Sequence, residues 1–229
     1  MWRFEGKTFW HNGDPLSLSH VSANNCAFNQ CFTRSVSRGW NRFSDIHLDN
    51  VSHWNCEVTG CVFDEVTLRH LKKAGSAPLF LNASVFRHVT LEGNISGLKV
   101  NRSELETLVQ ESDRKWRDEQ IVAFYSSVDW ALDISKAKFP NGATFEAIPG
   151  DKVVRDRTTQ ALIRREALSA TNWRALDYGQ TAIDIAISWF ETGSLFDAVV
   201  VVPRSSSKYR QADIAVIEML RRQGVAEPD

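Results

Sequence analysis

A five-residue repeat constrains this chain more than any other feature of its sequence. Residues 56–60, 61–65 and 66–70 each begin with a small or branched residue, have a large apolar residue third, and end with two polar or small residues; the second residue is polar except at Val62. The same order occurs in residues 21–30, 46–55, 79–81, 84–93 and, as a short echo, 132–139. A period of five matches neither the period of a strand nor that of a helix, so local amphipathicity does not explain it. Some larger arrangement must bury these side chains.

The pattern resembles the pentapeptide-repeat family over about residues 21–93, with the echo at 132–139. The resemblance implies a right-handed quadrilateral β-helix, in which the large central residue and the small residue two before it point inward. Stacked repeats of this kind need capped ends. We expect Trp2, Phe4, Phe9 and Trp10 to form an N-terminal cap, and residues 33–45 and 70–78, which break the register, to bulge out as loops.

Four cysteines and six histidines lie in this first part. Cys26, Cys31, Cys56 and Cys61 form two C-x4-C pairs, a spacing that could also indicate a zinc site. All four occupy the small inward position of the repeat, on successive faces of the coil, so we expect core packing and no metal or other cofactor. Of the histidines, His53 alone falls on a predicted core position, and no pair shows a metal-ligand spacing.

From residue 103 the sequence becomes helical and charged. Leu105, Leu108, Val109, Trp116, Ile121 and Phe124 predict a helical insertion at about 103–127. The turn signal at 149–151 predicts a boundary between a solenoid domain, 1–148, and a helix-rich α/β part, 149–229. In the second part we expect helices at 158–168, 178–191 and 210–223, the last ended by Gly224, and one buried strand at 196–202. The predicted fold class is therefore mixed β and α.

Two sets of residues are candidate binding sites. The segment Pro203–Arg210 combines hydroxyl groups, cations and a helix start, which suits an anion at Arg204, Ser206, Lys208 and Arg210. It lacks the glycines of a P-loop, and a solvated loop with a serine cap is the alternative interpretation. Trp54, Trp40 and Arg69 are candidate partner-binding residues, because tryptophan and arginine often anchor protein partners.

Composition and missing motifs favour a binding protein over an enzyme. The chain has 27 basic and 28 acidic residues, and no nucleophile elbow, dinucleotide fingerprint or H-E-x-x-H motif. Acid pairs such as Asp129 with Asp133, or Asp177 with Asp184, are interpreted as surface groups. The longest apolar run is too short to cross a bilayer, and no secretory signal is evident, so we expect a cytoplasmic protein without membrane partners.

The function expected from the sequence is a non-catalytic protein-binding protein of bacterial type. One form of it is an immunity or antitoxin-like protein that occludes a toxin from the same operon. The alternatives are an enzyme or anion-binding protein with a site at Arg204–Arg210 near Glu166, Asp177 or Tyr178, and a self-assembling scaffold. A DNA mimic that protects topoisomerases needs an acidic rod, whereas the first 100 residues hold eight acids and ten bases, so nucleic-acid mimicry or binding is not expected.

Overall fold

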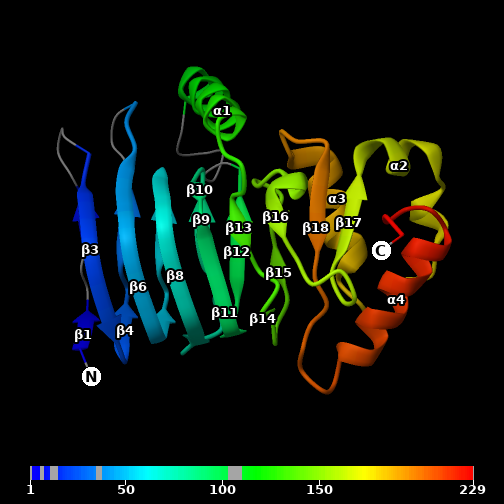
Figure 1. The fold of residues 1–229 in the computed structure, drawn as a ribbon, viewed down its shortest axis with the longest axis horizontal. Coiled ribbons are helices and arrows are strands. Elements are labelled where there is room, and N and C mark those ends of the chain that lie inside the picture. Colours follow the sequence, from blue (N-terminus) through cyan, green and yellow to red (C-terminus); the bar gives the residue numbers. More distant parts are fainter. Residues whose placement is uncertain (1, 6–7, 11–14, 35–37, 103–109, 229) are drawn as a thin grey trace.

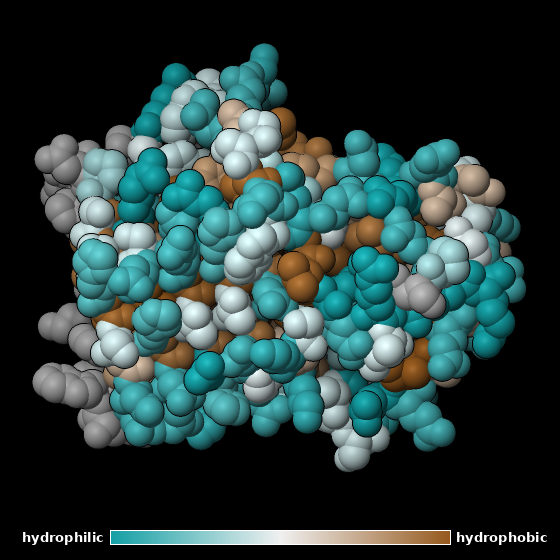
Figure 2. Space-filling view, viewed as in Figure 1, coloured by the Kyte–Doolittle hydropathy of each residue, from teal (hydrophilic) through white to brown (hydrophobic). Residues whose placement is uncertain are grey.

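The computed structural model describes residues 2–5, 8–10, 15–34, 38–102 and 110–228 as a mixed α/β fold with mostly parallel sheets and, within those ranges, four α-helices. Figure 1 shows the parallel strands side by side from the N-terminal end to the helical C-terminal part, with α1 across one end of the strands. Figure 2 shows hydrophilic residues over most of the same face, with hydrophobic residues visible between them near the middle.

The described strands form three sheets. The first contains β1 (Trp2–Glu5), β3 (Ser17–Asn24), β4 (Cys26–Asn29), β6 (Asn41–Trp54), β8 (Cys61–Lys73), β10 (Val85–Arg87), β11 (Val89–Ile95), β13 (Leu132–Asp133), β14 (Ala137–Lys138) and β16 (Val153–Val154). The second contains β2 (Thr8–Trp10), β5 (Phe32–Arg34), β7 (Glu57–Thr59), β9 (Leu79–Asn82), β12 (Leu98–Asn101) and β15 (Ala143–Thr144). The third pairs β17 (Ala161–Arg164) with β18 (Ala198–Val201).

Successive passes of the chain pair in parallel, and we compare them by the number of residues that separate paired positions in the sequence. Asn41 in β6 pairs with Cys61 in β8, twenty residues later, and Phe28 in β4 pairs with His53 in β6, twenty-five residues later. The second sheet has the same step, with Phe32 paired to Glu57. These separations are multiples of five, so equivalent positions of the repeat stack on each other there. Other neighbouring passes are 23 residues apart, as for Val62 and Val85, or 19 residues apart, as for Leu79 and Leu98.

A left-handed backbone conformation recurs at the last position of the repeat. Residues with φ between 45° and 70° follow one another in steps of five: His20, Asn25 and Gln30; then Asp45, Asn50, Asn55, Gly60, Glu65 and His70; then Ala83, His88 and Gly93. L-residues rarely adopt this conformation, and asparagine, aspartate, histidine and glycine tolerate it best. The choice of residue at this position therefore follows from the bend that the chain makes there.

The first position of the repeat faces the core. The residues after these bends are buried in ten cases: Cys26, Cys31, Ile46, Val51, Cys56, Cys61, Val66, Leu71, Ser84 and Val89. The third position packs against the same core, half-buried in most repeats. At this position three phenylalanine rings stack on one another. The centre of the Phe63 ring lies 5.4 Å from that of Phe43 and 5.5 Å from that of Phe86, and the ring planes of each pair differ by 17°. The expected core packing of the cysteines is confirmed, and all four are free.

Two expectations about the first part need correction. The segments 33–45 and 70–78 are not loops throughout, because β6 already begins at Asn41 and β8 continues to Lys73. At the N-terminal end, β1 and β2 pair in parallel with β4 and β5, so they extend the same stack, and the expected cap of Trp2, Phe4, Phe9 and Trp10 stays a prediction.

The helical insertion is α1, Glu111–Ser126. The predicted apolar residues Leu105, Leu108 and Val109 lie outside the described residues. The helix buries Ile121 and Tyr125, and the Tyr125 hydroxyl accepts a hydrogen bond from the Phe86 backbone N–H at 3.2 Å. The chain then returns to the stack, as the echo predicts, with Leu132 paired to Val89 and Ala137 to Gly93.

The C-terminal part differs from its prediction in three elements: the first helix is largely replaced by a strand, the short strand β16 was not expected, and α3 begins at Ile183 and not at residue 178. The helix expected at 158–168 is wrong: β17 occupies Ala161–Arg164 and only the short α2 (Arg165–Ala170) follows, so this part has two buried strands where one was expected. The apolar residues 161–163 suit a buried strand as well as a helix, and antiparallel pairing with β18 favours the strand. The strand expected at 196–202 and the helix expected at 210–223 are confirmed as β18 and α4 (Arg210–Arg222), and α3 spans Ile183–Gly193.

The two-stranded sheet joins both parts of the molecule. Leu162 and Val200 belong to the core of the stack, whereas Ile163 and Val199 pack with α3 and α4 in a second core. Alternate residues of a strand point to opposite faces, so the sheet has one core on each side. Gly150, at the predicted boundary, lies so close to β18 that a Cβ atom there would come within 2.8 Å of its backbone. The boundary itself stays a prediction.

No helix in the described part of the chain is long and apolar enough to cross a lipid bilayer.

Candidate functional site

Charged side chains lie at and beside the bends of the stack, and most of them pair between neighbouring passes. Examples are His20 with Asp45 (2.5 Å), His70 with Asp49 (3.3 Å), Arg69 with Glu92 (2.6 Å), Arg87 with Asp64 (2.6 Å) and His88 with Asp129 (2.7 Å), whereas His47 pairs with Asp45 (3.3 Å) within β6. The hydrogen bond from His20 is the main reason that the pKa of Asp45 lies below its usual range. Exposed pairs of this kind contribute little stability, so they mainly give the surface a mixed charge pattern.

Trp54 is an exposed aromatic residue beside the bend at Asn55. It is the last residue of β6, and 43% of it is accessible to solvent. Its indole lies over Gly75, where an added Cβ would come 2.5 Å from Cδ1 of the ring. A glycine at residue 75 therefore leaves room for the ring, since any larger residue there would collide with it.

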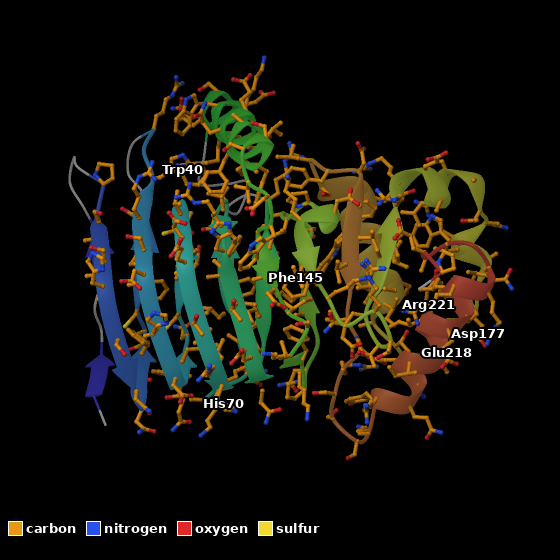
Figure 3. All side chains as sticks on the ribbon, viewed as in Figure 1. Trp40, His70, Phe145, Asp177, Glu218 and Arg221 are labelled. Atoms are coloured by element: carbon orange, nitrogen blue, oxygen red, sulfur yellow. The ribbon has the colours of Figure 1, made fainter. Side chains whose placement is uncertain are left out.

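The other two predicted partner-binding residues, Trp40 and Arg69, each contact another side chain of the protein. Trp40 is half-buried, and the Arg117 guanidinium of α1 lies 4.5 Å from the centre of its ring. Arg69 is more than half exposed but is paired with Glu92. In Figure 3, Trp40 lies near α1, whereas His70, next to Arg69 in the sequence, lies at the opposite edge of the strands. The structure therefore does not bring Trp40 and Arg69 together.

The predicted anion-binding loop is organised around an internal ion pair. The Arg204 guanidinium donates to Asp213 at 2.6 and 2.9 Å, and the Arg204 backbone N–H donates to the same carboxylate at 2.8 Å. This pairing raises the pKa of Arg204. Tyr209 covers the guanidinium, with its ring centre 3.9 Å from Cζ. Of the predicted anion-binding residues, Arg204 and Ser206 are half-buried, whereas the cations Lys208 and Arg210 are exposed.

The residues expected near this loop in an enzyme are engaged in local contacts, although Arg204 of the loop donates to the nearby Gln180 carbonyl at 3.2 Å. The Tyr178 hydroxyl donates to the Trp173 carbonyl at 2.9 Å, and burial raises the pKa of Tyr178 to about 12. Asp177 accepts the Gly179 backbone N–H at 2.8 Å, and Glu166 lies exposed on α2. Among the residues that the structure describes, no group of three or more His, Cys, Asp or Glu side chains could hold a metal ion.

A hollow of about 300 Å³ lies where α3 meets the second sheet. Its lining residues are Phe80, Lys99, Asn101, Glu146, Trp189, Thr192 and Gly193. Burial lowers the pKa of Lys99, whose ammonium lies 4.2 Å from the centre of the Trp189 ring. Burial also raises the pKa of Glu146, against the opposing effects of the Arg102 backbone N–H and the Lys99 charge.

Sequence reasoning missed this hollow. Its lysine, glutamate and tryptophan come from β12, the segment after β15, and α3, and none of them stands in a motif. Arg102 helps to hold the walls together, because its guanidinium pairs with Asp118 of α1 and donates to the Gly193 carbonyl at the end of α3. No local signal predicts that these segments meet, since only the docking of α3 on the stack brings them together.

Comparisons with known proteins found no matching family model, no matching curated protein and no matching solved structure.

Proposed function

We propose that the parallel passes are turns of a right-handed quadrilateral β-helix of the pentapeptide-repeat type, and that the protein is a non-catalytic protein-binding protein. The twenty-residue step from β6 to β8, as between Asn41 and Cys61, supports the first part, because it equals four repeats per turn. Under this proposal, longer steps such as the twenty-five residues from Phe32 to Glu57 hold extra residues between corners. The bends at every fifth residue fit one corner per repeat.

The observation that carries the binding proposal is Trp54. A large aromatic ring that stays 43% exposed, packed against Gly75, is a typical anchor for a partner. Charged side chains surround the bends of the stack, including the Arg69–Glu92 and His70–Asp49 pairs, and they suit the polar rim of an interface.

The partner that we favour is a toxin enzyme encoded in the same operon, which the protein occludes in the cytoplasm. Four free, buried cysteines fit a reducing compartment. An enzyme or anion-binding function in the C-terminal part has less support. The Arg204 guanidinium is already paired with the Asp213 carboxylate, and the Tyr178 hydroxyl donates to a backbone carbonyl. A net charge of −1 gives no support to mimicry of DNA.

Affinity capture from the native lysate tests this proposal, with the wild type, Trp54→Ala and a matched control, Trp189→Ala. Trp189 is another exposed tryptophan, 38% accessible, on α3. We expect one stoichiometric protein with the wild type and the control, and its loss with Trp54→Ala. Equal retention by all three proteins, or no stoichiometric protein with any of them, contradicts the proposed interface.

A further inference from the structure

The hollow beside α3 contains two opposite charges that do not pair with each other. Among the described residues, neither Lys99 nor Glu146 has an ion-pair partner within 4.0 Å. Lys99 instead contacts the Trp189 ring, and Glu146 receives the backbone N–H of Arg102. Lys99 and Glu146 act on each other as opposite charges without direct contact, and Arg102 adds a positive charge near Glu146. Partly buried charges gain most from direct pairing, so a ligand with both charges could contact Lys99 and Glu146 at once.

The rest of the lining is apolar or neutral. Phe80 of β9 and Trp189 of α3 supply aromatic surfaces, and Asn101 and Thr192 supply neutral polar groups. A volume of about 300 Å³ is enough for a small molecule. The matching chemistry is a small zwitterion with an apolar body.

We propose that this hollow binds a free α-amino acid with a large apolar side chain. Its carboxylate pairs with the Lys99 ammonium, its ammonium pairs with the Glu146 carboxylate, and its side chain packs on Phe80 and Trp189. This proposal rests on the hollow alone and is independent of the protein-binding surface at Trp54.

An NMR titration of the full chain with L-phenylalanine tests it, with the Trp189 indole N–H signal as the probe, assigned by its loss in Trp189→Phe. Two derivatives serve as comparison ligands: N-acetyl-L-phenylalanine, which lacks the ammonium, and L-phenylalanine amide, which lacks the carboxylate. Each missing charge removes one charge-assisted hydrogen bond, so we expect affinity for each derivative to fall about ten- to a hundredfold.

Two variants assign each end of the ligand. In Lys99→Met the amide is expected to bind as well as phenylalanine, and in Glu146→Gln the N-acetyl derivative is expected to do so. Lys138→Met, which changes an exposed lysine of β14 outside the hollow, is the control and is expected to keep the wild-type preferences.

The proposal is overturned if phenylalanine gives no saturable shift of the Trp189 signal, or if the three ligands bind the wild type equally. It is also overturned if Lys99→Met and Glu146→Gln keep the wild-type discrimination. None of these results depends on the capture experiment with Trp54→Ala, so the two proposals can fail separately.

Discussion

Replacing His53 by leucine is expected to stabilise the protein. His53 occupies the third position of its repeat, where most repeats have a large apolar residue, and it is only 2% exposed. Neither ring nitrogen makes a hydrogen bond of good geometry among the described residues, and the Ser96 backbone, which favours the protonated ring, only partly opposes the effect of burial on the His53 pKa. A buried polar group without a partner costs roughly 1–3 kcal/mol, so His53→Leu should raise the free energy of unfolding by about that amount. For a chain of this length, each kcal/mol corresponds to a shift in Tm of about 2–4 °C.

The difference in free energy of unfolding between His53→Leu and the wild type should grow as the pH falls. Burial lowers the pKa of His53 below its ordinary value of 6.5. Between the two pKa values the unfolded chain binds a proton that the folded chain does not, so protonation favours unfolding. The penalty is absent above the unfolded-state pKa and begins as the pH falls through about 6.5, at up to roughly 1.4 kcal/mol per pH unit until the folded-state pKa is reached.

Urea denaturation of the wild type and His53→Leu at pH 8.0 and 5.5 measures both effects. The matched control is His47→Leu, since His47 lies exposed at the neighbouring repeat, and its substitution should change stability by no more than about 0.5 kcal/mol at pH 8.0. The reasoning is refuted if His53→Leu is less stable than the wild type at pH 8.0, or if the difference between them does not widen at pH 5.5.

Three further predictions concern stability and thiol chemistry. Asp213→Ala should lower the free energy of unfolding by about 3 kcal/mol in urea, because it leaves the nearly buried Arg204 without its carboxylate; a loss below about 1 kcal/mol contradicts the structural role of the pair. Tyr125→Phe should cost about 1–3 kcal/mol in the same assay, because the Phe86 N–H loses its acceptor, and a neutral effect would argue against the docking of α1. Burial raises the pKa of Cys61 to about 12, so its thiol should react with Ellman's reagent only after denaturation, and fast labelling of the native protein at this residue contradicts the packing.

The repeat predicted the core of the first part because its spacing reflects a regular geometry. Cysteine or a branched residue recurs at the first position, and those side chains are buried. The polar fifth position carried a second signal, since His20, Asn25 and Asn50 are residue types that tolerate the left-handed conformation found there. Histidines occur at this position because they tolerate the left-handed backbone conformation.

The errors arose where the sequence lacks such regularity. Residues 41–45 belong to β6 because they pair with β3 and β8, although their sequence departs from the repeat. At 161–163 the apolar run is compatible with helix or strand, and contact with β18 determines the outcome. The hollow of Lys99, Glu146 and Trp189 depends on contacts between distant segments, which no local pattern encodes.

Disulfide trapping tests the central claim, the parallel stacking of passes twenty residues apart. His47 of β6 pairs with Thr67 of β8, whereas Lys72 pairs with Ser52, five residues further along. Adjacent strands lie about 4.8 Å apart, within the range of Cα separations that a disulfide spans. The account predicts that His47→Cys with Thr67→Cys forms a disulfide on mild oxidation of the native protein, detected by mass spectrometry after digestion. It also predicts that His47→Cys with Lys72→Cys stays reduced. Preferential oxidation of the second pair would contradict the stacking register.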